Sequence, residues 1–97
     1  MSREELIEQY DDLIFWDNLD EAIIGVAERI NLSVVAYDTG KILEILMRDM
    51  EVDDSDLEEG ETRESIQYQM ALEYYEFNIL GAWVGDYTPV HIRLSLE

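Results

Sequence analysis

The expected fold depends first on residues 62–80, which read TRESIQYQMALEYYEFNIL. Thr62 belongs to the residue types that cap helix starts, and the residues after it predict one long helix that ends near Leu80. At about 100° per residue, its apolar residues fall on two opposed faces. One stripe is Ile66, Met70, Tyr74 and Phe77, and the other is Tyr68, Leu72, Tyr75 and Ile79. Such a helix is either central to a bundle or keeps one face for a partner chain, and we expect the central position.

Three shorter helices are predicted before this one. Ser2 and Glu5 have the spacing of a capping box, which predicts a first helix that ends near Ile14. Apolar residues at helical spacing predict a second helix over residues 19–30 and a third over residues 39–50. A longer first helix would place two aromatic residues on its acidic face, so we expect it to end before them.

The remaining segments contain little regular structure. Residues 33–37, Ser-Val-Val-Ala-Tyr, have the composition of a strand, but they cannot form a sheet alone, so the segment is either extended or a buried loop. Two glycines and the only proline predict an ordered, turn-rich tail over 81–90. We therefore predict a mainly α fold, a compact bundle of about four helices with at most a short β segment near residues 33–37. Residues 1–95 are expected to form a single domain, and Leu96-Glu97 is interpreted as a cloning scar.

The charge balance limits the functions that the chain can have. Among 97 residues, 24 Asp and Glu face 6 Lys and Arg, which gives a formal net charge of -18 at pH 7. Such a charge repels phosphate backbones and attracts basic surfaces, so we expect a basic protein partner and no direct nucleic-acid binding. The chain has no Cys and no apolar run long enough for a membrane span, which favours a cytoplasmic protein that does not insert into membranes.

No catalytic or metal-binding constellation is recognisable in the sequence. His91 is the only histidine, no cysteine accompanies it, and no serine lies in a Gly-x-Ser-x-Gly elbow, so we interpret His91 as a polar surface residue. Asp54, Asp56 and Glu58 have the spacing of the first ligands of an EF-hand, but the required Gly and the last Glu are missing. We expect a non-enzymatic protein without a metal or another cofactor.

The candidate partner-binding residues are acidic or aromatic. On the polar face of the first predicted helix, they are Glu4, Glu8 and Asp11. Residues 51–61 contain no basic residue and form a predicted surface loop. The candidates of this acidic loop are Asp53, Asp54, Asp56, Glu58, Glu59 and Glu61. Trp83 and Tyr87 are the aromatic candidates, because aromatic residues concentrate at interfaces, although core packing explains them equally well.

One stretch of the sequence has a family resemblance. Residues 73–89 read EYYEFNILGAWVGDYTP and contain the pattern Phe-Asn-x-x-Gly-Ala-x-x-Gly-x-x-Thr-Pro. Together with residues 34–38, VVAYD, and residues 41–47, KILEILM, this stretch resembles small uncharacterised proteins encoded by tailed bacteriophages. The resemblance implies an origin and no mechanism.

A phage origin implies two alternative functions. A small acidic protein made inside a bacterium can bind a basic surface of a host protein, as DNA mimics and some anti-CRISPR inhibitors do. The alternative is a structural, assembly or accessory protein that self-associates through an apolar helix face. We expect such self-association to use the spare stripe of residues 62–80 or Trp83.

Overall fold

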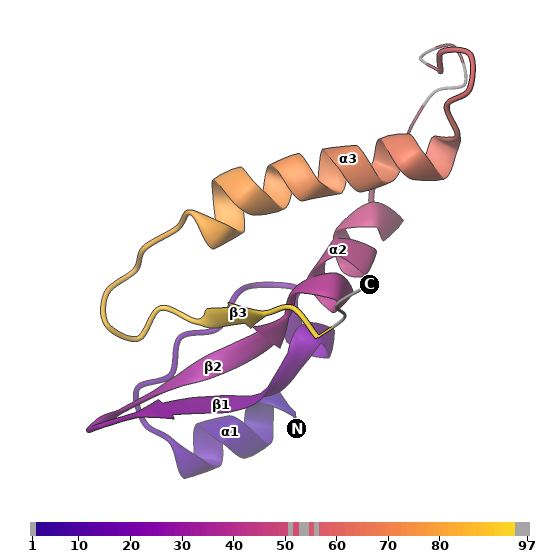
Figure 1. Cartoon of the computed structure of the whole chain (residues 1–97). Helices are drawn as coiled ribbons and strands as arrows, with labels where there is room; N and C mark the ends of the chain where they lie inside the picture. The colour runs from indigo at the N-terminus through magenta and orange to yellow at the C-terminus, as the bar shows by residue number, and fades with distance from the viewer. Residues whose placement is uncertain (1, 51, 53–54, 56, 95–97) are drawn as a thin grey trace.

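Three helices and a three-stranded sheet make up the described part of the chain. This computed structural model describes residues 2–50, 52, 55 and 57–94. In chain order the elements are α1 (Arg3–Gln9), the short helical turn η1 (Asp20–Ala22), β1 (Ile23–Arg29), β2 (Leu32–Asp38), α2 (Thr39–Arg48), α3 (Arg63–Tyr75), the π-helical turn η3 (Glu76–Leu80) and β3 (Val90–Ile92). Figure 1 shows α3 along one side of the molecule and α1 on the opposite side, with α2 and the sheet between them.

The expected four-helix bundle is wrong, because residues 23–38 form a β-hairpin where the second helix was predicted. β1 pairs with β2 in the antiparallel sense, and Ala27 lies opposite Val34. At the chain reversal Asn31 has φ 64°, a conformation that Asn tolerates better than most residues. The β-branched residues of β1 favour a strand once a partner strand is available. The fold is therefore α+β and not purely helical.

A β-bulge explains why β1 imitates helical spacing. The register moves from Ile23 opposite Tyr37 to Gly25 opposite Ala36, so β1 contains one extra residue. Ile23 and Val26 consequently both contact the core although they are not an even number of residues apart. Gly25 has φ 152° at the bulge, which residues with a side chain rarely adopt.

Of the two alternatives at residues 33–37, the structure has the extended one, as part of β2, the central strand of a three-stranded sheet, so the expectation of at most a short β segment is wrong. β3 runs parallel to β2 on its other edge, with Ala36 opposite Val90 and Asp38 opposite Ile92. A parallel pair needs a long crossover, and here α2 and α3 supply it. The turn-rich tail thus ends in a strand that the sequence analysis did not predict.

α1 starts where the sequence predicts and ends earlier. The backbone N of Glu5 donates to Ser2 Oγ at 3.2 Å, which confirms the cap. The helix stops at Gln9, and residues 13–16 form a half-buried irregular segment. Because so short a helix is marginal in water, α1 depends on the fully buried Leu6, which anchors it to the core.

α2 and α3 confirm the two other predicted helices. Asp38 caps α2, and its Oδ1 accepts from the backbone N of Gly40 at 2.9 Å. Thr62 caps α3, and its Oγ1 accepts from the backbone N of Ser65 at 3.1 Å. The turn η3 carries the helical chain on to Leu80, the predicted end. The expected central position of α3 is wrong, because it lies along the outside of the molecule (Figure 1).

One apolar core joins the sheet to all three helices. Its buried residues are Leu6, Leu19, Ala22, Ile23, Val35, Tyr37, Ile42, Leu43, Ile45, Ala71, Tyr75 and Ile79. Val34 to Tyr37 are buried in succession, so β2 is covered on both faces. Among the described helices, none has both the length and the apolar character that a membrane crossing requires. The predicted cloning scar at 96–97 lies outside the described residues.

Candidate protein-binding surface

The acidic candidates of the first helix are all exposed on or next to α1. Glu4 and Glu8 lie within the helix, and Asp11 follows its end. The nearby Arg3 is engaged elsewhere, since its Nη1 lies 3.5 Å from Asp20 Oδ1. No ion pair between described residues involves the three candidates. Their charges therefore remain available to a partner.

The acidic loop candidates that the structure describes lie just before α3. Glu58 and Glu59 are exposed, whereas Glu61 is half-buried. The Oε1 of Glu61 accepts from the backbone N of Glu58 at 2.8 Å, so this carboxylate partly serves the local turn. The other candidates of the loop lie outside the described residues, namely Asp53, Asp54 and Asp56.

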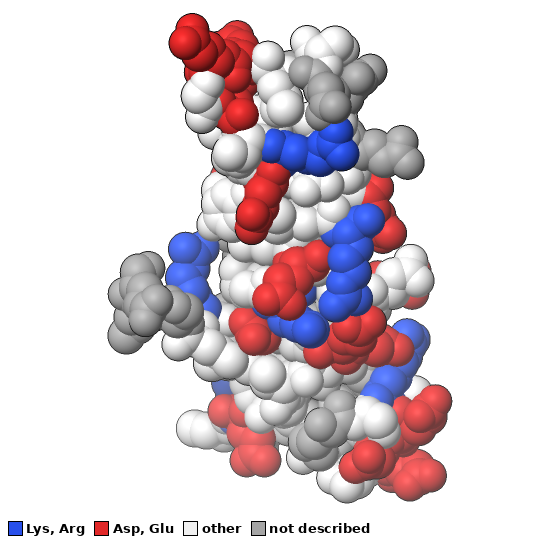
Figure 2. Space-filling view, turned by 90° about the vertical axis from the view of Figure 1, so that its right-hand side faces the viewer, with Lys and Arg blue, Asp and Glu red and all other residues white. Residues whose placement is uncertain are grey.

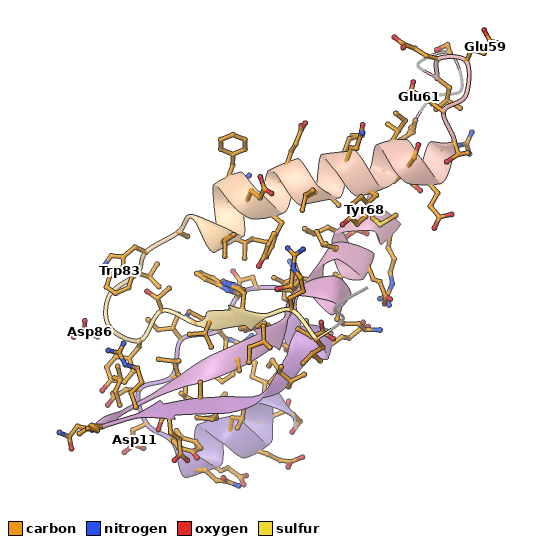
Figure 3. The ribbon with its side chains drawn as sticks, in the orientation of Figure 1. Asp11, Glu59, Glu61, Tyr68, Trp83 and Asp86 are labelled. Atoms are coloured by element: carbon orange, nitrogen blue, oxygen red, sulfur yellow. The ribbon has the colours of Figure 1, made fainter. Side chains whose placement is uncertain are left out.

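The structure does not join these two acidic groups into one surface. Figure 3 shows Glu59 and Glu61 beyond one end of α3 and Asp11 near the opposite end of a molecule whose longest dimension is 52 Å. On the face seen in Figure 2, acidic side chains lie at the top and the bottom and also at mid-height, where most of the basic side chains lie beside them. The ion pairs among described residues use other carboxylates, those of Asp20, Glu21 and Glu44. A partner therefore meets two separate acidic ends.

The two aromatic candidates lie in one ordered loop between η3 and β3. Trp83 is 74% exposed, whereas Tyr87 is half-buried. Thr88 Oγ1 donates to the carbonyl of Gly85 at 2.6 Å and accepts from the backbone N of Val84 at 2.9 Å. These bonds fix the loop, so the exposure of Trp83 is built into the fold.

Tyr87 and Asp11 come together at a surface hollow of about 340 Å³. The other walls come from residues 10–13 and from the hairpin, including Glu28 and Arg29. The structure thus joins one acidic and one aromatic candidate. Arg29 lines the same hollow, so its positive charge partly offsets the negative charge of the carboxylates there.

The helical stretch of α3 and η3 exposes most of one apolar stripe, together with Tyr68 of the other. Met70 and Tyr74 are exposed, and Phe77 is 82% exposed. On the inner side, Ala71 and Tyr75 are buried in the core. The helical stretch therefore packs on the core through its inner face, and its outer stripe is left largely exposed to solvent.

An apolar groove runs between α2, the end of α3 and the segment that precedes η1. Its volume is about 410 Å³. The apolar lining residues are Trp16, Leu19, Ile45, Leu46, Met50, Tyr74 and Ile79. Two exposed carboxylates, Asp17 and Asp49, line it as well. Tyr74 belongs to both the groove and the exposed stripe of α3, so the two apolar surfaces are continuous.

The groove could not be predicted from the sequence, because its walls come from three separate segments. The only local signal was the pair Phe15-Trp16, whose aromatic rings would have lain on an acidic helix face. We expected the helix to end before them, and it ends earlier still, at Gln9. Trp16 is consequently free to turn toward α2 and α3.

The expected surface role of His91 is wrong, because it lies half-buried among aromatic rings. Trp16 Nε1 donates to His91 Nε2 at 3.0 Å, and the Tyr75 ring meets the imidazole edge-on at 5.6 Å between ring centres. Burial lowers the pKa of His91 below its usual value, since water no longer solvates the charged form. Among the described residues, the hydrogen-bond partner of the His91 side chain is Trp16.

A second polar contact lies in the buried region around Tyr75. The hydroxyls of Thr39 and Tyr75 lie 3.2 Å apart and hydrogen-bond to each other. Burial is also the main cause that raises the pKa of Tyr37, whose Oη accepts from the backbone N of Trp16 at 2.9 Å. Among the described residues, no buried side-chain nitrogen or oxygen atom lacks a hydrogen-bond partner.

The described residues include no group of three or more His, Asp or Glu placed to hold a metal ion. Comparisons with known proteins are equally plain: no protein-family model, no curated protein and no solved structure matches this chain.

Proposed function

We propose that this chain is a non-enzymatic binding protein that docks on a basic surface of another protein. The observation that carries the proposal is the set of exposed carboxylates at both ends of the molecule that make no ion pair with any described residue. With a net charge of -18, these carboxylates gain more from a basic partner than from solvent alone at low ionic strength.

The proposal places the protein in the cytoplasm of a bacterial host cell. This part rests on the resemblance of residues 34–38, 41–47 and 73–89 to tailed-phage proteins and on the absence of Cys from the sequence. Because the two acidic ends are far apart, the partner contacts either one end or a long stretch of the molecule.

A second candidate function is self-association through the outer stripe of α3. The exposure of Phe77 favours it, because a large aromatic ring in water is costly unless a partner covers it. Two copies of this chain repel each other, so added salt should strengthen self-association. Binding to a basic partner has the opposite dependence on salt.

The experiment combines light scattering with capture on the immobilised chain at rising salt. The double variant Glu8→Lys with Asp11→Lys reverses two charges at one end. The double variant Glu58→Lys with Glu59→Lys makes the same change in net charge at the other end. We expect a monomer that retains basic proteins at low salt, and one charge-reversed pair that loses most of this retention. Retention that persists unchanged at about 0.5 M salt, where charges are screened within a few ångströms, would contradict the proposal.

A further inference from the structure

The groove between α2, α3 and residues 16–19 combines an apolar lining with acidic groups at its edge. Trp16 and Leu46 contribute half-buried apolar surface from opposite walls, and Tyr74 is 48% exposed beside them. Asp17 and Asp49 are exposed and form no ion pair with another described residue. An apolar floor with a negative rim selects a ligand that is apolar on one side and positive on the other.

We propose that this groove binds a basic amphipathic helix of the partner protein. This inference rests on the proposed function and adds the kind of segment that is recognised. Leucine-like side chains of the helix would fill the groove, and Lys or Arg side chains beside them would face Asp17 and Asp49. The exposed stripe of α3, with Met70 and Phe77, continues the apolar contact past Tyr74.

The geometry favours a helix over an extended peptide. The groove is formed by helices and one irregular segment, so it offers no free strand edge on which an extended backbone could pair. A groove of about 410 Å³ has room for a few large side chains presented by one helix face. In the part of the chain that the structure describes, no buried side-chain polar atom is left without a partner, so none is spare to orient a small polar molecule in the groove.

The charge of the chain argues against a second copy as the occupant. Each copy brings a net charge of -18, and the rim carboxylates would face a surface of the same sign. With a basic helix the electrostatic interaction is attractive instead of repulsive, and it favours binding most at low salt.

The probe is a synthetic helical peptide of about 18 residues made of leucine and lysine, with leucines at every third and fourth position. Two control peptides keep its length: one has the same residues in scrambled order and lacks an apolar face, and the other has glutamate in place of lysine. Binding is followed by the emission of Trp16 in a Trp83→Phe background, because Trp16 lines the groove and these are the only two tryptophans.

Matched variants separate the groove from the rest of the surface. Tyr74→Ala removes a groove wall, and Tyr68→Ala removes a tyrosine of the same helix that is similarly exposed, at 45%, outside the groove. Asp49→Lys reverses a rim charge at the end of α2, where a cation also suits the helix dipole. Glu59→Lys makes the same change in net charge in the acidic loop before α3, outside the groove.

We expect saturable binding of one leucine–lysine peptide per chain, with a blue shift of the Trp16 emission. Tyr74→Ala and Asp49→Lys should each weaken it about tenfold, and Tyr68→Ala and Glu59→Lys less than about threefold. Equal losses within either pair, or equal binding of a control peptide, would overturn the groove as the site. So would light scattering that shows two chains joined through the groove. If the peptide fails while salt-sensitive capture of basic proteins persists, this inference falls and the proposed function stands.

Discussion

Replacing Tyr37 by Phe tests the contact that holds the groove wall on the sheet. Tyr37 is fully buried in β2, and its hydroxyl accepts the backbone N–H of Trp16 at 2.9 Å. Phe keeps the ring and almost the same volume, so the core packing is preserved. The change removes only the acceptor and leaves the Trp16 amide without its partner.

The expected cost follows from that single bond. A typical hydrogen bond contributes about 0.5–1.5 kcal/mol to stability, and a buried donor left unpaired costs about 1–3 kcal/mol. Trp16 is half-buried, so water reaches its amide in part and the lower half of the second range applies. We expect Tyr37→Phe to lower the free energy of unfolding by about 1–2 kcal/mol, which corresponds to a fall in Tm of roughly 4–16 °C for a domain of this size.

The assay is urea unfolding at pH 7 followed by circular dichroism, with Tyr68→Phe as the matched control. Tyr68 is exposed and its hydroxyl forms no described hydrogen bond, so its loss should change stability by less than about 0.5 kcal/mol. In a Trp83→Phe background, Tyr37→Phe should also shift the emission of Trp16 to the red. Equal stability of the two tyrosine variants would show that the Tyr37 hydroxyl does not hold Trp16 on the sheet.

Three further predictions concern the core, the imidazole and the aromatic loop. Leu6→Ala should cost about 2–5 kcal/mol in urea unfolding because it empties a fully buried site, whereas Ile7→Ala, at a position 53% exposed, should cost less than about 1 kcal/mol; equal costs would mean that α1 is not anchored. Burial lowers the pKa of His91, so its neutral form contributes stability above about pH 6.5 that is lost as the pH falls through the folded-state pKa. His91→Gln should therefore flatten the decline of Tm below that pH, and an unchanged slope would refute this origin. Gly85 has φ 102°, so Gly85→Ala should cost about 1–2 kcal/mol and increase proteolysis of the Trp83 loop, and an unchanged Tm would show that no strain arises there.

Local sequence patterns predicted the elements that depend on local forces. The caps at Ser2 and Thr62 were identifiable because a capping side chain bonds the backbone a few residues away. The long helix over 62–80 was likewise correct in both bounds, because its periodicity extends over several turns. The signals that start these helices are local, although α1 also depends on the burial of Leu6 in the core.

The hairpin and the parallel strand could not be predicted in the same way. The bulge at Gly25 shifts the alternation of β1, so Ile23 and Val26 carry a spacing that fits a helix as well as a bulged strand. Only the pairing of Ala27 with Val34 and its neighbours decides between the two. β3 is too short to show any period, and its pairing partner lies more than fifty positions earlier in the chain.

In the candidate site, too, the residue types could be read from the sequence, but their positions depend on tertiary contacts. Sequence analysis could identify acidic and exposed residue types, such as Glu8 and Glu59, but a count of carboxylates gives no position, and the structure sets these two at opposite ends. The apolar stripe of α3 was visible as a pattern, yet its exposure depended on where α3 packs. Phe77 is exposed because α2 and the sheet already occupy the inner face of the helix.

The groove depends on a contact that joins the two ends of the sequence. Trp16 forms one wall, and its indole N–H donates to His91 in β3, which is itself placed by pairing with Tyr37 in β2. The position of the Trp16 wall therefore depends on the register of β3 against β2, although β3 contributes no residue to the groove. A change in β3 that leaves every groove residue intact should still weaken peptide binding, and it should do so in parallel with the loss of the Trp16–His91 bond. Binding that survives displacement of β3 would mean that α2 and α3 hold the ligand without this wall.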